Sequence, residues 1–285
     1  MRIFLAGATG VIGRRLLPLL IEHGHEVTAL TRQPGEVPRL RALGAAAVVG
    51  DVLDRDAVLR AVRSAVPEVV LHQLTDLRDQ NFEANSELRK TGTRHLVDAA
   101  LAAGARRVVA QSIAWAYQAG DVPAAEGTPL DLTASGSRLR TVRGVAALEA
   151  AVRSAPEWVL LRYGLLYGPG TWYASNGLMA ARARRGELAA DGDVSSFVHV
   201  GDAARAAVAA LDWPPGAVNV CDDLPTAGSG WVPAFGRAVG APVTPVPFRE
   251  AERHRWARGA SNAHARKDLS WTPAHPSWRA GFAAL

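Results

Sequence analysis

Short apolar runs alternate with longer segments of helical periodicity over the first 165 residues. Continuous apolar runs bounded by glycine or polar residues are typical of buried parallel strands. The segments between them predict crossover helices, including a long one over residues 82–102 and another over residues 139–154. The pattern therefore predicts an α/β fold, a Rossmann-type doubly wound parallel sheet with a smaller C-terminal substrate-binding region. The expected strands lie at residues 3–6, 26–31, 45–50, 68–72, 107–111 and 158–162.

The alternation breaks after residue 165, where several glycines and a proline precede a short predicted helix and strand. We expect a dinucleotide-binding domain over residues 1–165. Residues 166–285 are expected to form mainly the substrate-binding region, with a lid around residues 168–190, although the chain is free to cross back to the sheet.

Three glycines directly follow the first apolar run, at Gly7, Gly10 and Gly13, and leucines with helical spacing come next. In such a turn the first glycine bends the chain, the second lets the backbone approach a pyrophosphate, and the third packs the helix on the sheet. The anion would lie at a helix N-terminus. The alternative is a glycine-rich turn without a ligand. The candidate cofactor-binding residues in this turn are Gly7, Thr9, Gly10, Val11, Ile12 and Gly13.

Composition narrows the class of protein. The chain has 285 residues and a formal net charge of +5, but its basic residues are nearly all scattered arginines rather than a cluster. This distribution favours solvated helix faces over nucleic-acid binding. No apolar run is long enough to span a bilayer, and the single Cys221 cannot form an internal disulfide. We expect a cytoplasmic protein, monomer or homodimer, with a small-molecule aromatic ketone as its partner, no membrane or nucleic-acid partner, and no metal.

Several motifs in order along the chain resemble the extended and atypical short-chain dehydrogenase/reductases, including the NAD-dependent epimerase/dehydratase group. They are residues 7–13, Gly50-Asp51-Val52, His72-Gln73-Leu74, Gly92-Thr93, residues 197–202 and Trp271-Thr272-Pro273. Within that superfamily, the chain is most similar to atypical ketoreductases of actinobacterial aromatic polyketide (angucyclinone) biosynthesis.

The resemblance implies further cofactor contacts. Asp51 and Val52 would line the adenine, Leu74 would neighbour the ribose, and the turn Tyr163-Gly164-Leu165 would lie beside the nicotinamide. Each has a structural alternative: Asp51 can cap its own turn, and Val52 and Tyr163 can be core residues.

The end of the second strand indicates which nicotinamide cofactor is used. An acidic residue there would bind the ribose hydroxyls and repel a 2′-phosphate, but the chain has Thr31-Arg32-Gln33. Arg32 can make bidentate phosphate contacts, so we expect NADP(H). The alternative for Arg32 is an ordinary exposed charge.

The catalytic signature of the superfamily is missing. Its members normally use a Tyr with a Lys four residues later and a Ser or Thr, because the Lys lowers the Tyr pKa for proton exchange. No Tyr-x-x-x-Lys occurs in this chain. Alignment by motif spacing puts Ile113, Thr141 and Val145 at the Ser, Tyr and Lys positions, with Ser112 as a weak catalytic candidate. By the same spacing, Arg89 takes the place of a usual Asn.

Aromatic residues cluster near the predicted carboxyl edge of the sheet, where ligands of open α/β folds bind. For each of them, ordinary core packing is the alternative. The candidate substrate-binding residues are Gln111, Ser112, Trp115, Tyr117, Trp172, Tyr173, Met179 and His199.

These features predict an NADPH-dependent ketoreductase that reduces a ketone on an aromatic polyketide-type, angucyclinone-like substrate without the Tyr-Lys pair. Positioning and a proton from the substrate itself would replace the protein acid. The alternatives are a non-catalytic NADP-binding sensor and a sugar-nucleotide epimerase or dehydratase.

Overall fold

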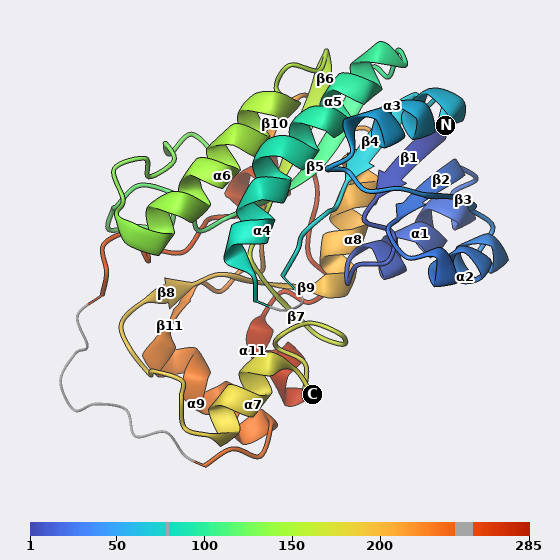
Figure 1. The fold of residues 1–285 in the computed structure, drawn as a ribbon. Helices are drawn as coiled ribbons and strands as arrows, with labels where there is room; N and C mark the ends of the chain where they lie inside the picture. The colour runs from blue at the N-terminus through green and yellow to red at the C-terminus, as the bar shows by residue number, and fades with distance from the viewer. Residues whose placement is uncertain (78–79, 243–252) are drawn as a thin grey trace. The chain divides into compact units, whose positions relative to one another are not determined.

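The fold was analysed in a computed structural model, which describes residues 1–77, 80–242 and 253–285 (Figure 1). The chain forms two compact units, and each is built from three separate segments. Unit 1 comprises Met1–Ser112, Leu132–Leu161 and Ala204–Ala217. Unit 2 comprises Ile113–Asp131, Arg162–Ala203 and Val218–Leu285. The boundary expected at residue 165 lies close to one of the crossings between them.

A seven-stranded sheet has the order β10-β6-β5-β4-β1-β2-β3. β1 pairs in parallel with both β2 and β4, so the order reverses beside β1, as in a doubly wound fold. The predicted Rossmann-type fold is confirmed. The strands are β1 Arg2–Ala6, β2 Glu26–Thr31, β3 Ala46–Val49, β4 Val69–His72, β5 Arg107–Ile113, β6 Glu157–Tyr163 and β10 Gly216–Val220.

One strand boundary differs from the prediction in a way that affects the site. β5 runs on past the expected end at Gln111 to Ile113, so Ser112 and Ile113 lie within the strand and not after it. The extension follows from continued pairing, because Ala114 N donates to Tyr163 O at 2.9 Å.

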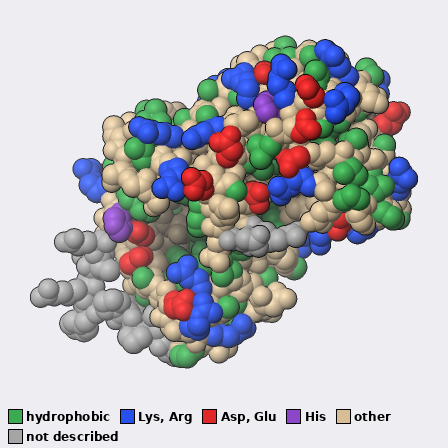
Figure 2. Space-filling model, viewed as in Figure 1, with side chains coloured by type: hydrophobic (Ala, Val, Ile, Leu, Met, Phe, Trp, Pro, Cys, Tyr) green, Lys and Arg blue, Asp and Glu red, His purple; other side chains and the backbone are tan. Residues whose placement is uncertain are grey.

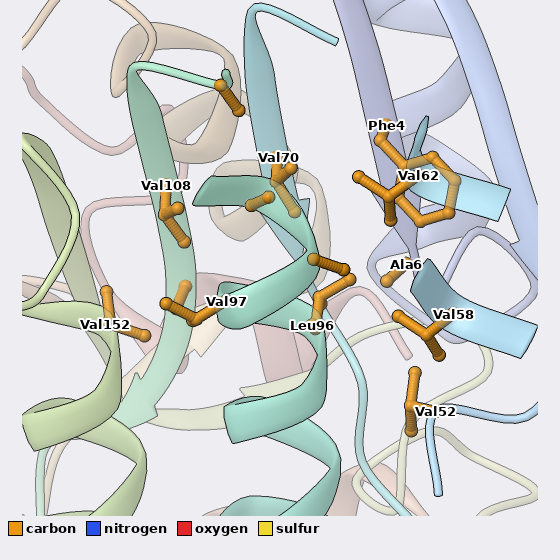
Figure 3. Packing of buried hydrophobic residues seen from close by; sticks show 14 of the residues in the cluster. Phe4, Ala6, Val52, Val58, Val62, Val70, Leu96, Val97, Val108 and Val152 are labelled. Carbon is orange, nitrogen blue, oxygen red and sulfur yellow. The ribbon is translucent and has the colours of Figure 1, made fainter. Parts of the chain in front are cut away.

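Helices cover the sheet of unit 1, and α3, α5 and α6 lie side by side (Figure 1). Figure 3 shows Val62 of α3 and Leu96 and Val97 of α5 packed in the same cluster as Phe4 and Val70 of the sheet. Burial of such apolar surface is the main stabilising contribution to this layer. The helices of unit 1 are α1 Gly13–Glu22, η1 Pro34–Glu36, α2 Val37–Ala42, α3 Arg55–Ala65, α4 Phe82–Glu87, α5 Thr93–Ala102 and α6 Gly136–Val152, and α8 Val200–Ala209 belongs to both units.

The long helix predicted over residues 82–102 is not uniform. A π-helical turn, η2 Leu88–Gly92, separates α4 from α5. Gly92 is required there, since a Cβ at this position would lie 2.9 Å from Val52 Cγ2. π-Turns inside α-helices are frequent at functional sites.

Unit 2 is built around an aromatic cluster that includes Tyr173, Phe197, Trp231, Phe235 and Phe282. Two small sheets accompany it: β8 pairs antiparallel with β11, and β7 pairs in parallel with β9. Its elements are β7 Leu165–Tyr167, α7 Leu178–Arg184, β8 Val194–Ser195, β9 Phe197–His199, β11 Thr226–Ala227, α9 Gly228–Ala238, α10 Ala263–Lys267 and α11 Trp278–Ala283.

On the face drawn in Figure 2, Lys and Arg side chains are interspersed with Asp and Glu. Within the described residues, no helix combines the length and the apolar character that crossing a membrane requires.

Candidate cofactor and active site

The glycine turn after β1 leaves no room for side chains. Gly7 has φ +103°, and a Cβ there would lie 2.4 Å from the Gln73 carbonyl oxygen. A Cβ on Gly13 would lie 2.0 Å from Gly7 O, so α1 begins in direct contact with the turn. Gly10 is exposed at its tip, between half-buried Thr9 and Val11, while Ile12 is buried. A backbone cradle of this kind at the start of a ten-residue helix fits the pyrophosphate of a dinucleotide.

Hydrogen bonds and core packing fix the turn after β3. The Asp51 carboxylate accepts a hydrogen bond from Leu53 N at 3.0 Å. Val52 is buried in the core cluster, and His95 Nδ1 lies 3.0 Å from its carbonyl oxygen. The structure thus gives both residues a structural role, the alternative raised for each from the sequence.

Buried polar groups follow β4 beside the glycine turn. His72 is fully buried, its Nδ1 accepts from Leu74 N at 3.3 Å, and its Nε2 therefore donates to Thr93 Oγ1 at 2.8 Å. Burial lowers the His72 pKa to about 4, so the ring is neutral at physiological pH. Both polar side-chain atoms of Gln73 are enclosed without a hydrogen-bond partner among the described residues.

Arg32 lies at the end of β2, as expected, but it has an acidic neighbour that the sequence did not suggest. Its Nη1 is 3.2 Å from an Asp76 carboxylate oxygen. Arg14 likewise lies 3.7 Å from Glu36 and donates to Thr9 O at 2.9 Å. The available signal was that Asp76 follows β4, whose carboxyl end meets the same sheet edge as that of β2.

The residues that motif spacing puts at the Ser, Tyr and Lys positions, and Ser112 beside them, are hydrogen-bonded within the chain or apolar. Ser112 Oγ donates to Glu149 Oε1 at 2.8 Å in a buried pair. On α6, Thr141 Oγ1 donates to the Ser137 carbonyl at 3.2 Å, while Val145 is buried. Ile113 is also buried. None of these side chains has the acidity of a Tyr activated by a Lys.

The turn from β6 to β7 is fixed within unit 2. The Tyr163 hydroxyl donates to Ala203 O at 3.1 Å, and Leu165 N donates to Ser196 O at 2.8 Å. A Cβ on Gly164 would lie 2.7 Å from Ser196 O. The Tyr163 side chain is therefore a buried anchor, whereas Gly164 and Leu165 line a cavity.

That cavity lies within unit 2 and has a volume of about 230 Å³. Trp115, Tyr117 and Trp256 give it aromatic walls, and the Arg258 guanidinium is part of its lining. Of the predicted substrate-binding residues, Trp115 and Tyr117 line it.

The other aromatic residues predicted to cover a substrate lie elsewhere. Tyr173 is buried in the aromatic cluster, with ring centroids 5.3 Å from Phe197 and 5.7 Å from Trp231, and burial raises the pKa of its phenol. Trp172 and Met179 pack against the same cluster. These residues were expected to form a wall of the substrate site. They pack in the core of unit 2 instead, because burial stabilises an aromatic side chain as well in a core as in a lid over a ligand.

His199 lies beside Asp202 and His275, with one possible ligand atom of each within 4.8 Å of the others. The buried Asp202 carboxylate accepts hydrogen bonds from Ala274 N at 2.8 Å and His275 N at 3.0 Å. It lies 3.0 Å from His275 Nδ1 as well. These contacts anchor the segment that precedes α11.

Comparison with known proteins shows which family the chain belongs to. The profile of the NAD dependent epimerase/dehydratase family matches residues 3–221. A 3-diazoavenalumate denitrifying reductase from Streptomyces sp is 45% identical, over 99% of each chain. A ceramide reductase from Caulobacter vibrioides is 30% identical over 80% of this chain and 66% of its own length.

Solved structures agree on the fold. UDP-glucose 4-epimerase from Thermotoga maritima has a TM-score of 0.77 at 20% identity, covering 99% of this chain and 96% of the other. The UDP-glucose 4-epimerase of Thermus thermophilus, in complex with NAD, has a TM-score of 0.73 at 25% identity, covering 99% and 97%. The glycine cradle and these matches together establish the chain as an oxidoreductase with a nicotinamide dinucleotide site, and it belongs to the NAD dependent epimerase/dehydratase family of extended short-chain dehydrogenase/reductases.

Proposed function

We propose that this protein is an NADPH-dependent reductase of aromatic substrates that delivers hydride without a protein acid. One observation carries the proposal: α6 presents Thr141 and Val145 where the family resemblance puts Tyr and Lys. An epimerase or dehydratase of the usual type needs that pair to move a proton. A reaction that needs only hydride does not.

The preferred substrate is an aromatic diazo compound. The Streptomyces relative's name, a denitrifying reductase of 3-diazoavenalumate, supports this choice. When bound, the reduced dinucleotide supplies a hydride, so that an aryl diazonium loses N2 and gains hydrogen at the same carbon. The carbon–nitrogen bond breaks, a carbon–hydrogen bond forms, and no proton is consumed. Such a reaction needs no proton donor, so it can proceed in a protein without a Tyr-Lys pair.

Reduction of a ketone on an aromatic polyketide-type substrate is the second candidate. Ketone reduction consumes one hydride and one proton, and a phenol next to the carbonyl would supply the proton. The aromatic lining of the cavity in unit 2 by Trp115, Tyr117 and Trp256 suits flat rings in either case.

The chain's own residues hold and orient the reactants in this proposal. The glycine turn binds the pyrophosphate, and Arg32 binds a 2′-phosphate. Held in the right orientation, reacting groups gain an effective molarity worth roughly 7–11 kcal/mol of the barrier.

The experiment compares a stabilised aryl diazonium salt with a hydroxyaryl ketone as oxidants of NADPH, followed by absorbance and N2 release. NADPH that carries deuterium on the transferred position should deliver it to the arene carbon that bore nitrogen. The control is the same mixture without protein, which measures any direct reaction of the diazonium salt with NADPH. Faster turnover of the ketone would favour the second candidate. Tight NADPH binding with no turnover of either would indicate a sensor and overturn both.

A further inference from the structure

Arg89 is a buried cation with no polar partner in the part of the chain that the structure describes. It lies in the π-turn η2, and only 6% of the residue is exposed. Over residues 1–77, 80–242 and 253–285, no hydrogen bond or ion pair to its guanidinium is present. By motif spacing it occupies the place where the family usually has a neutral Asn, so the resemblance gives no reason for a charge there.

The surroundings place Arg89 at the unusual part of the site. A Cβ on Gly144 of α6 would lie 3.6 Å from Arg89 Cδ, so the arginine stem crosses α6 at this glycine. Gly144 immediately precedes Val145 and follows Thr141 by three residues, which is nearly one helical turn. The Arg89 side chain therefore packs on α6 at the turn that carries the two positions where the resemblance puts Tyr and Lys.

Among the described residues, no group that interacts with Arg89 carries a compensating negative charge. Its charge is close enough to His72 to help lower the pKa of that ring, and His72 is neutral. Burial lowers the Arg89 pKa to about 10, which leaves it charged at physiological pH. A buried guanidinium is costly unless an anion and hydrogen-bond acceptors compensate it.

The guanidinium is not completely enclosed by the described residues. Among the described residues, the fully enclosed side-chain nitrogens and oxygens that lack partners belong to Arg39, Gln73, Tyr167 and Trp231. Arg89 is not one of them, although no described residue pairs with it either. Its planar fork of N–H donors matches an oxyanion bidentately.

We infer that Arg89 is a substrate-binding group that takes an oxyanion of the aromatic substrate, a carboxylate or a phenolate. The inference rests on the proposed function in that the bound molecule is the aromatic substrate. With a phenolate, the contact withdraws electron density toward oxygen and keeps a conjugated diazo group in its electrophilic diazonium form. With a carboxylate, the contact orients the ring.

The test measures binding without turnover, by calorimetric titration of unreactive probes at pH 7. The probes are cinnamate, which carries only the carboxylate, 4-hydroxycinnamamide, which carries only the phenol, and neutral cinnamamide. We expect wild-type protein to bind at least one oxygen-bearing probe more tightly than cinnamamide. Arg89→Gln should lose that preference, about tenfold or more, and leave NADP+ affinity unchanged. Lys90→Gln, on the exposed side of the same turn, is the matched control and should bind every probe like the wild type.

A second readout separates binding from structure. Because a buried charge without a partner among the described residues is costly, Arg89→Gln should raise the thermal midpoint of the ligand-free protein and abolish the shift that the anionic probe produces. A lowered ligand-free midpoint with unchanged probe binding, or a loss confined to NADP+ affinity, would overturn the inference. If Arg89→Gln does not fold, Arg89→Lys and the wild-type comparison of the three probes decide the same question. Probe binding that depends on Arg89 without any diazonium or ketone turnover would refute the proposed function and leave the oxyanion site standing.

Discussion

Replacement of Arg32 by Ala should lower the affinity for NADPH much more than the affinity for NADH. Arg32 directly follows β2, with its side chain about half exposed and its guanidinium 3.2 Å from the Asp76 carboxylate. To bind a 2′-phosphate, the guanidinium must exchange that carboxylate for the phosphate. The loss of NADPH affinity is therefore set by the difference in free energy between the Arg32–phosphate contact and the Arg32–Asp76 ion pair.

Both contributions can be bounded. An exposed ion pair such as Arg32–Asp76 is worth at most about 1 kcal/mol, because water screens it. A hydrogen bond to a charged group contributes about 1.5–3 kcal/mol. With the ion pair at its full value, the difference of about 0.5–2 kcal/mol corresponds to a preference for NADPH of roughly 2–30-fold, since about 1.4 kcal/mol is tenfold. Asp76→Asn removes the competing carboxylate and should raise NADPH affinity by up to about fivefold.

The assay is a fluorescence titration of the protein with NADPH and NADH at low and high salt. Arg32→Ala should bring the two affinities together, and Arg41→Ala, another exposed arginine, should leave their ratio unchanged. Added salt should narrow the wild-type ratio. An unaltered ratio in Arg32→Ala, or tighter NADH binding by the wild type, would refute the electrostatic reasoning.

Three further predictions follow from buried groups near the site. Because the folded His72 pKa is about 4, the unfolded chain takes up its proton first as pH falls below about 6.5, and stability is lost from there down to pH 4. Chemical denaturation should show about 2 kcal/mol of this loss between pH 7.5 and pH 5, and His72→Leu should lack it. Gln73→Leu should raise the free energy of unfolding by about 1 kcal/mol, since it removes two enclosed polar atoms without partners among the described residues; a decrease would mean that they are satisfied. Ser112→Ala and Thr141→Ala should lower turnover by less than about tenfold, whereas loss of a true proton donor costs about 10²–10⁴-fold.

The sheet was predictable because parallel strands buried on both faces appear in the sequence as continuous apolar runs. The strand expected at residues 26–31 is β2 without any change of bounds. The end of β5 was missed by two residues, since the polar pair Gln111 and Ser112 indicated a strand end and pairing with β6, distant in sequence, continues the strand. The π-turn η2 was missed as well, because the helical periodicity continues through it and Gly92 packs against Val52, forty residues away in sequence.

The residues of the candidate site also fall into those that the sequence predicts and those that it does not. The glycine turn follows from local sterics, so its residues could be identified without the fold. The partners of charged groups depend on contacts distant in sequence, as with Arg32 and Asp76, and were not foreseen. Aromatic residues were ambiguous for a different reason. Trp115 lines a cavity and Tyr173 lies in a core, yet nothing in their neighbours along the chain separates these two fates.

Ketone reduction consumes a proton and reductive loss of N2 does not, and this difference gives the last prediction. Arg89 beside Thr141 and Val145 stabilises negative charge on oxygen, which assists both a phenol that gives up its proton to a ketone and a phenolate conjugated to a diazo group. In ketone reduction an exchangeable proton enters the product, so turnover in D2O should fall and the new hydroxyl hydrogen should come from solvent. In reductive loss of N2 the hydrogen that replaces nitrogen comes wholly from the dinucleotide, so turnover in D2O should be nearly unchanged and the arene should carry no solvent deuterium at that carbon. Measured on a substrate that turns over, solvent deuterium at the denitrified carbon would refute direct hydride delivery, because it would require protonation of a carbon anion and hence an acid that α6 does not provide.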